Sequence, residues 1–352
     1  MMSRYYMSLW GDPGYHSYGM AMLYSKAEVQ KGYDNGSLLV DDVGNGKAVV
    51  RRRSDQKWFL GSAFAEHAYT ILLGAVCGDV AGSVYERNNI THFPDKNDMI
   101  KPQARVTDDS VMTMAVATGI SLALDELGED WMTKPQHREV ISREIIDALQ
   151  HFGSKYPNAG YGGSFRRWLN SYDPQPYNSW GNGSAMRVSF AGWAGRTLEE
   201  AETLAELSAA VTHNHPEGIK GAKVIAGIIY LLRSGKTKEE VRRYARQYYD
   251  LDFTIEQIRP DYRFDVSCQG SVPQAIVAFL EGEDFVDVMA RAIWLGGDSD
   301  TIAAIACSMA EVLYPIPRSV LDQVIDRLDP FQKERLELCI DWAIAWNRLG
   351  QE

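Results

Sequence analysis

Cysteine is scarce in this chain, and its few cysteines have none of the spacings that metal sites or disulfide frameworks use. No C-x-x-C pair occurs, and all four cysteines lie in or beside apolar stretches: Cys77, Cys268, Cys307 and Cys339. Zinc-binding and disulfide-rich folds depend on such short spacings. We therefore expect buried free thiols in a reducing compartment, and a cytoplasmic location.

Excess positive charge and long apolar runs are also missing. The formal net charge is −11 at pH 7, which argues against bulk binding to nucleic acid or to a membrane surface. The longest apolar run that we identify, residues 224–232, is too short to span a bilayer. The N-terminal residues, MMSRYYMSLW, lack the apolar core and cleavage site of a signal peptide. We expect neither a membrane nor a nucleic acid among the partners.

Clear strand signals are missing after residue 62. The composition is globular, with 45% hydrophobic and 24% charged residues. The spacing of apolar residues predicts helices at 63–85, 111–127, 138–152, 164–170, 198–211, 218–234, 238–249, 271–281, 284–295, 302–313, 319–328 and 330–349. No repeat and no linker divides residues 62–352. The expected fold is one all-α domain over residues 62–352, preceded by an N-terminal extension over residues 1–61.

The extension differs in composition from the rest of the chain. Asn45-Gly46 predicts a hairpin turn between strands at 37–42 and 48–52. Tyrosines and a tryptophan come before this hairpin, and residues 51–53 are all arginine, a composition found on binding surfaces. The segment is too small to hold a large core alone. It is either a packed or partly disordered decoration of the main domain, or an arm that binds a partner.

A short acidic turn in the C-terminal part of the chain is the centre of the candidate site. Residues 296–306 read GGDSDTIAAIA and offer three oxygen ligands: Asp298, Asp300 and Thr301. The glycines permit a tight turn, and the apolar run behind them predicts a buried helix. Acids in this position either cap the helix or converge on a hard cation, and capping needs only one of them.

A second acidic turn has the same chemistry. Residues 105–117 read RVTDDSVMTMAVA, so Thr107, Asp108 and Asp109 again precede an apolar helix. Six oxygen donors are too many for one Mg²⁺ that keeps its waters, but they suit two divalent ions about 3.5–4 Å apart. The pair of turns therefore favours a dinuclear metal centre over two independent helix caps.

Two glycine-rich turns lie between the acidic ones, AGYGGS at 159–164 and SWGNGSAMRVS at 179–189. Turns of this kind expose backbone N–H groups that hold phosphate oxygens, helped by the helix N-terminus that follows. Either turn alone is weak evidence for a phosphate site. Together they indicate an anionic ligand.

Histidine and glutamate add fewer clues. THNHPEGIKG at 212–221 places His213 and His215 two positions apart. Without a third soft ligand nearby, hydrogen-bonding or structural histidines are the better interpretation. Glu86 ends the segment GAVCGDVAGSVYE, whose small residues and Asp79 indicate close helix packing.

Taken in order, these motifs resemble those of the ADP-ribosylglycohydrolases, the group that includes the hydrolase reactivating ADP-ribosylated nitrogenase reductase. The resemblance covers residues 66–315 and rests on GDVAGSVYE, VTDDSVM, AGYGGS, GNGSAMRV, THNHPEGIKGA and GGDSDTIAAIA. It implies an orthogonal all-α bundle with two divalent cations, Mg²⁺ or Mn²⁺. The family's metal ligands map onto Thr107, Asp108, Asp109, Asp298, Asp300 and Thr301.

The resemblance also implies roles for residues around the metals. The acid near the metals maps onto Glu86, and Glu86, Asp108 and Asp109 are the candidates for the general base. The substrate-contacting residues map onto Gly160, Tyr161, Gly162, Gly163, Ser164, Gly181, Asn182, Gly183, Ser184, Met186 and His213. His215 lies in a stretch that varies across the family, and no role is transferred to it.

The implied reaction removes ADP-ribose from a protein side chain, most simply arginine. The diphosphate would lie against the glycine-rich turns, while the metals would activate water and stabilise charge as the N-glycosidic bond breaks. Phe165, Trp168 and Trp180 are aromatic candidates for stacking on adenine, with core packing as the alternative for each.

Three functions remain open at this point. The first is an ADP-ribosyl-protein hydrolase. The second is a non-enzymatic inhibitor that blocks an ADP-ribosyltransferase toxin through residues 1–61, since the extension is similar in kind to the arm of immunity-protein members of the family. The third is a structural protein with a dead site, which the complete ligand set disfavours. The first two are compatible with each other.

Overall fold

The computed structural model describes residues 38–44, 47–52 and 71–349. Within the extension, β1 (Leu38–Gly44) pairs with β2 (Lys47–Arg52) in antiparallel register, with Val40 opposite Val50. The register shifts between Asp42 and Gly44. The rest of residues 1–61 lies outside the described residues, and so does the start of the helix predicted at 63–85.

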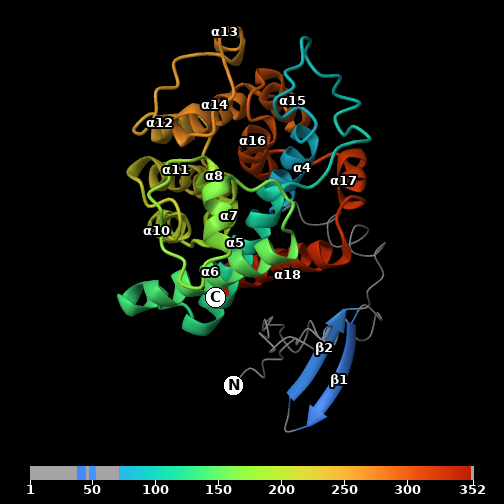
Figure 1. Ribbon diagram of the computed structural model, residues 1–352. Helices are drawn as coiled ribbons and strands as arrows, with labels where there is room; N and C mark the ends of the chain where they lie inside the picture. The colour runs from blue at the N-terminus through green and yellow to red at the C-terminus, as the bar shows by residue number, and fades with distance from the viewer. Residues whose placement is uncertain (1–37, 45–46, 53–70, 350–352) are drawn as a thin grey trace.

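From residue 71 onward every regular element that the structure describes is a helix, as the sequence predicts. In chain order they are α4 (Leu73–Gly82), α5 (Asp108–Leu127), η1 (Trp131–Thr133), α6 (Gln136–Lys155), α7 (Gly163–Leu169), α8 (Gly183–Met186), α9 (Ser189–Ala194), α10 (Leu198–Ala210), α11 (Pro216–Arg233), α12 (Lys238–Ala245), α13 (Ile255–Ile258), α14 (Cys268–Glu281), α15 (Phe285–Leu295), α16 (Ser299–Leu313), α17 (Arg318–Ile325) and α18 (Pro330–Leu349). Helices α14, α15 and α16 gather at one end of the bundle and α6 and α18 at the other, with α5 between them (Figure 1).

Helices α4 and α16 pack unusually closely (Figure 1). Gly74, Gly78 and Gly82 recur every four residues along one face of α4, which is the spacing of a single helix face. A Cβ atom at Gly78 would stand 2.2 Å from the carbonyl oxygen of Ala303. The glycines therefore let two backbones touch, and this contact carries Asp79 up to the beginning of α16.

Helix α5 lies in the centre of the core. Its 20 residues are long and apolar enough to cross a membrane by length and composition, which corrects our statement that no run reaches that length. Hydroxyl residues interrupt its apolar sequence. Thr118 and Ser121 donate to the carbonyls of Met114 and Ala117, each at 2.8 Å. Since 78% of its most apolar window is buried, α5 has the packing of a core helix.

Several short helices are absent from our predictions. α8, α9 and α13 have four to six residues, too few to display a helical period. For α13 a local signal exists, because Thr254 and Gln257 form a capping box around its first turn. The predicted helix at 63–85 is also wrong at its end. α4 stops at Gly82, and the chain then turns through Arg87, whose φ is 65°.

Candidate metal centre

The structure brings the two acidic turns side by side. Asp108 and Asp109 occupy the first turn of α5, and Asp298 is the N-cap of α16 with Asp300 in its first turn. The hydroxyl of Thr301 donates to Asp109 Oδ2 at 3.3 Å, across 192 residues of sequence. Both turns therefore present their oxygen atoms to one shared space, with the positive ends of two helix dipoles behind the carboxylates.

Asp79 is an additional acid at this place, which our sequence analysis assigned only to packing. Its carboxylate accepts hydrogen bonds from the Thr107 amide at 3.0 Å, the Thr107 hydroxyl at 2.5 Å and the Ser110 amide at 3.1 Å. The Ser110 hydroxyl also donates to it. Asp79 thus caps the start of α5 from the neighbouring helix. An acid inside an otherwise apolar run is the sequence signal that identifies it.

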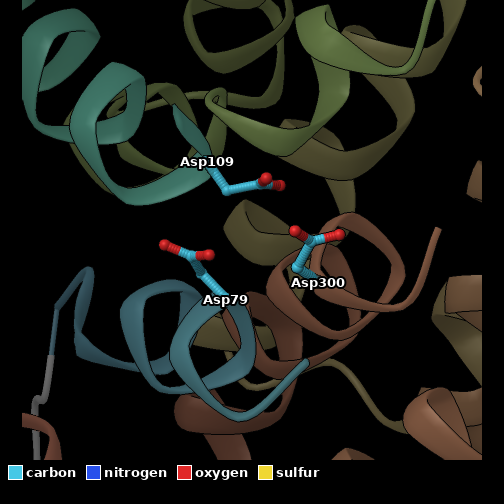
Figure 2. Close-up of side chains that lie close together, drawn as sticks. All are labelled: Asp79, Asp109 and Asp300. Carbon is cyan, nitrogen blue, oxygen red and sulfur yellow. The ribbon is translucent and has the colours of Figure 1, made fainter. Parts of the chain in front are cut away.

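Three buried carboxylates meet at the centre of the cluster (Figure 2). Asp79 from α4, Asp109 from α5 and Asp300 from α16 each place one oxygen within 4.8 Å of the others. The lone pairs of Asp79 are largely used by its hydrogen bonds. In contrast, Asp109 Oδ1 is buried and has no hydrogen-bond partner among the described residues. Asp109 therefore keeps free coordination capacity, whereas Asp300 Oδ1 accepts the Thr301 amide at 3.0 Å. Asp79 acts as a support for both acids.

The electrostatics of the cluster call for a cation. Burial raises the pKa of Asp109, and the charge of Asp300 raises it further. Burial and Asp298 likewise raise the pKa of Asp300. Burial, then Asp79, raises the pKa of Asp108 to about 7. Within the described chain no lysine or arginine pairs with Asp109 or Asp300. So many buried acids are costly unless protons or a cation neutralise them, and hard oxygen donors fit Mg²⁺ or Mn²⁺.

Glu86 lies on the turn after α4 and is the most accessible acid of the group. Its side chain is 31% exposed and pairs with Arg87 at 3.4 Å. Burial raises the pKa of Asp298 and of Asp300, and the charge of Glu86 raises both further. Asn89 Oδ1, further along the turn, accepts the Gly297 amide at 2.9 Å. This bond ties the segment that carries Glu86 to the acidic turn before α16.

The first glycine-rich turn also reaches the acids. Gly160 adopts a φ of +125°, and a Cβ there would stand 2.8 Å from Asp108 Oδ1. The hydroxyl of Tyr161 is buried and has no hydrogen-bond partner among the residues that the structure describes. Burial and then the charge of Asp108 raise its pKa. A Cβ at Gly162 would meet nothing within 4 Å, so this N-cap of α7 borders open space. Ser164 accepts a hydrogen bond from Arg167 at 3.0 Å.

The second glycine-rich turn divides into two parts. The amide of the Asn182 side chain donates to Asp298 Oδ2 at 2.7 Å and to Ser271 at 3.0 Å, so Asn182 orients an acid. Ser184 donates to the Gly218 carbonyl at 2.7 Å, and Met186 is 7% exposed. The side chains of these last two residues are thus turned into the protein. With this orientation, Ser184 and Met186 can make their predicted contacts with the substrate only through backbone atoms.

The glycines of that turn face His213. A Cβ at Gly183 would stand 3.2 Å from His213 Nε2, and one at Gly181 would stand 3.4 Å from the same atom. Gly181 also forms a β-bridge with Ser267, at the start of α14. The absence of side chains at both glycines leaves the outer nitrogen of the histidine close to the backbone of the turn.

The three aromatic candidates differ in accessibility. Phe165 and Trp168 are 9% and 4% exposed and stack on each other with ring centroids 5.6 Å apart. They belong to the core. Trp180 is 53% exposed and contacts His215 edge to face. Trp180 alone of the three is open to a planar ligand.

The chain is similar in sequence to known proteins. The chain is 24% identical over 310 residues to ADP-ribosylhydrolase ARH3 of Bos taurus, covering 69% of this chain and 83% of the relative. It is 25% identical to ADP-ribosylhydrolase ARH3 of Gallus gallus over 353 residues, covering 77% and 89% respectively. An uncharacterized protein of Archaeoglobus fulgidus is 30% identical over 163 residues, which are 41% of this chain and 53% of that protein.

Structural comparison agrees at the level of the fold. A solved structure titled ADP-ribosylglycohydrolase-related protein complex superposes with a TM-score of 0.57 at 22% identity, covering 84% of this chain and 98% of the other. The family model described as ADP-ribosylglycohydrolase matches residues 61–347. By this match, which covers nearly all of the helical part, the chain belongs to the ADP-ribosylglycohydrolase family.

Proposed function

We propose that this chain is a metal-dependent hydrolase that removes ADP-ribose from a modified protein side chain, with arginine as the linked residue. The observation that supports this most is the buried cluster of Asp79, Asp109 and Asp300, in which Asp109 Oδ1 lacks any partner in the described chain. A protein that used these residues only for helix capping would not accumulate so many uncompensated acids. The cluster fits a catalytic site better than a purely structural one.

The acids and their hydrogen-bond partners have two roles. Asp109, Asp298 and Asp300, with Asp108 and the two threonine hydroxyls, would hold two divalent cations. Such ions lower the pKa of water and stabilise developing negative charge. Asp79 and Asn182 keep the acids in place through the hydrogen bonds described above.

Proton transfer is assigned to Glu86. A general base must reach solvent and substrate as well as the reacting water. Asp109, Asp298 and Asp300 are at most 6% exposed, whereas the Glu86 side chain is 31% exposed and close to Asp298. Glu86 is therefore the proposed acceptor of the proton from water, with Asp108 as the second candidate.

The substrate diphosphate is assigned to the glycine-rich turns. The first amides of α7 have no acceptor within that helix, and Gly162 borders open space. His213 and the backbone of Gly181 and Gly183 supply a second wall. Backbone N–H groups at the start of a helix suit phosphate oxygens, whereas the Gly181 N–H already donates to Ser179 Oγ at 3.1 Å. The exposed ring of Trp180 completes the arrangement as a stacking surface.

A direct assay tests the proposal. The full chain is incubated with an ADP-ribosyl-arginine peptide and Mg²⁺, and free ADP-ribose is measured by chromatography. Parallel reactions use Mn²⁺, a chelator, and a peptide in which serine carries ADP-ribose. Release from arginine that stops with chelator supports the proposal. Release from the serine peptide alone would support the hydrolase activity but show that serine, not arginine, is the linked residue. No release from either peptide would overturn both the activity and the arginine linkage.

The inhibitor function concerns the extension. An arm that blocks an ADP-ribosyltransferase toxin would lie in residues 1–61, most of which are outside the residues that the structure describes. The composition of that segment remains its support, and the proposal of an immunity role is kept as a second activity of the same chain. Its test is to separate toxin binding from hydrolysis by deleting residues 1–61.

A further inference from the structure

A buried arginine lies behind the second glycine-rich turn. Arg187 is 1% exposed and, among the described residues, forms no ion pair with a carboxylate. Its Nη2 atom donates to the Ser208 carbonyl at 3.1 Å and to the Thr212 hydroxyl at 2.7 Å, while its Nε is buried without a partner. Its guanidinium carbon lies 5.5 Å from the centroid of the Phe165 ring, but no carboxylate of the described residues neutralises its charge, and such a buried cation is costly.

The hydrogen-bond direction along this chain of residues follows from chemistry. A guanidinium has donors only, so the Thr212 oxygen must accept from Arg187. The hydroxyl hydrogen of Thr212 then has two acceptors to choose from, His213 Nδ1 at 2.6 Å and the Ala209 carbonyl at 3.5 Å. The shorter distance is normal for such a bond, and the longer one is at its limit. Thr212 therefore donates to His213 Nδ1.

This direction fixes the protonation state of the histidine. A ring nitrogen that accepts a hydrogen bond carries no proton, so a neutral His213 must carry its hydrogen on Nε2. Burial lowers the pKa of His213, and the charge of Arg187 lowers it further, which keeps the ring neutral. Nε2 makes no hydrogen bond with the described residues, and it lies against Gly181 and Gly183. The Nε2–H group of His213 is thus a donor without a partner among the described residues, beside the turn at residues 181–183.

We propose that Arg187 and Thr212 are positioning residues that hold His213 as the Nε2–H tautomer, so that its free N–H binds an anionic oxygen of the ligand at residues 181–183. The inference rests on the proposed function in one respect, because it takes that oxygen to belong to the diphosphate of ADP-ribose. The charge of Arg187, which no carboxylate of the described residues neutralises, acts in the same direction, since it makes this wall attractive to anions.

The tautomer can be measured without any assay of activity. Histidine ¹⁵N shifts of the full chain are recorded by long-range ¹H–¹⁵N correlation, and the His213→Gln spectrum identifies the His213 signals among those of seven histidines. We expect one tautomer, protonated at Nε2. In Thr212→Val, which removes the hydroxyl, we expect a mixture of tautomers, and Thr212→Ser should restore the single form. Protonation at Nδ1, or a mixture in the unmodified chain, would overturn the proposal.

Binding is measured separately, by calorimetry with free ADP-ribose. Thr212→Val should weaken binding about tenfold, which corresponds to about 1.4 kcal/mol, and Thr212→Ser should restore it. If Thr212→Val does not fold, the tautomer of the unmodified chain still decides the matter. The unmodified chain could show the Nε2–H tautomer and yet fail to bind ADP-ribose. This result would contradict the proposed substrate but not the positioning of His213. Unchanged affinity in a folded Thr212→Val protein would overturn the positioning role.

Discussion

At the scale of single residues, the acids of the centre act against the stability of the metal-free fold. Buried like charges raise one another's pKa and cost free energy in proportion. Asp109 and Asp300 show this most clearly, because burial and then the charge of a neighbouring acid raise the pKa of each. Such residues are kept for a ligand rather than for folding.

The first prediction follows from that conflict. Asp300→Asn removes one of the like charges, so the metal-free protein should melt about 1–2 °C higher, the shift that about 1 kcal/mol produces in a chain of this length. The same variant should lose hydrolysis and the increase in melting temperature caused by Mg²⁺. Asp261→Asn, at an exposed position, is the matched control and should change none of these. Near-normal turnover by Asp300→Asn would remove this residue from the metal site.

Asp79 is expected to behave in the opposite way. Asp79→Ala leaves the buried amides of Thr107 and Ser110 without their acceptor, a loss of about 2–4 kcal/mol. The denaturant midpoint should therefore fall, and Mg²⁺ affinity should fall with it because α5 loses its cap. Asp98→Ala, whose side chain is 61% exposed beside Lys101, should leave the midpoint unchanged. A stable Asp79→Ala protein with weakened metal binding would instead make Asp79 a ligand.

At the scale of elements, the α4–α16 contact decides where the acids meet. The glycine face of α4 lies directly on the backbone of α16, and Gly82 faces Ser299 and Asp300 themselves. Any increase in the distance between these helices would move Asp79 away from Asp300. The helix pair is therefore part of the site as well as of the core.

Substitution of the central glycine tests this contact. Gly78→Ala places a methyl group 2.2 Å from a backbone oxygen, so we expect a loss of about 1–3 kcal/mol in stability and weaker Mg²⁺ binding. Gly162→Ala serves as the control for stability, because it has no atom within 4 Å of the new methyl group and an ordinary φ of −60°. Chemical denaturation with and without Mg²⁺ provides both measurements. Equal stability of the two variants would show that the helices can separate freely.

At the scale of the whole molecule, stability should depend on pH and metal together. Burial raises the pKa of Asp108 to about 7, above the value of about 3.9 in an unfolded chain. Between these values the folded, metal-free protein holds a proton that the unfolded chain has released. Raising the pH through that window therefore destabilises the metal-free fold.

The corresponding measurement is a thermal melt across pH. The contribution of this cluster should make the metal-free protein more stable at about pH 5 than at about pH 8. Mg²⁺ should stabilise the protein most at the higher pH, where the carboxylates are ionised. The difference between Asp300→Asn and the unmodified chain isolates the cluster from other titrating groups. Stabilisation by Mg²⁺ that is independent of pH would show that the cation binds elsewhere.

The extension is tested by separating two activities. Deletion of residues 1–61 should leave hydrolysis of a small ADP-ribosyl-arginine substrate intact but abolish tight binding of an ADP-ribosyltransferase toxin, whereas Asp298→Ala should do the reverse. A pull-down from the native host with the Asp298→Ala protein as bait supplies the toxin. Tyrosine, tryptophan and arginine are typical of strong protein contacts. Should the shortened chain bind as tightly as the full one, the immunity proposal loses its main support.

Much of this protein follows from local sequence. A threonine followed three residues later by glutamate or glutamine sets the start of α12 and α13 through capping boxes. The acids before α5 and α16 and the glycines of the turns are also visible in the sequence, because turn and cap chemistry depends on neighbouring residues only. The all-α class could be predicted on the same grounds.

Tertiary structure decided which of these residues meet. Asp79 serves the start of α5 from another helix, Asn182 orients Asp298, and Ser184 turns inward to Gly218. The order of hydrogen bonds that gives His213 its tautomer likewise begins at a buried arginine. A buried polar group needs a partner, but which partner it finds depends on packing between distant helices. No local pattern contains that information, and for this reason the support of the site became visible only in the fold.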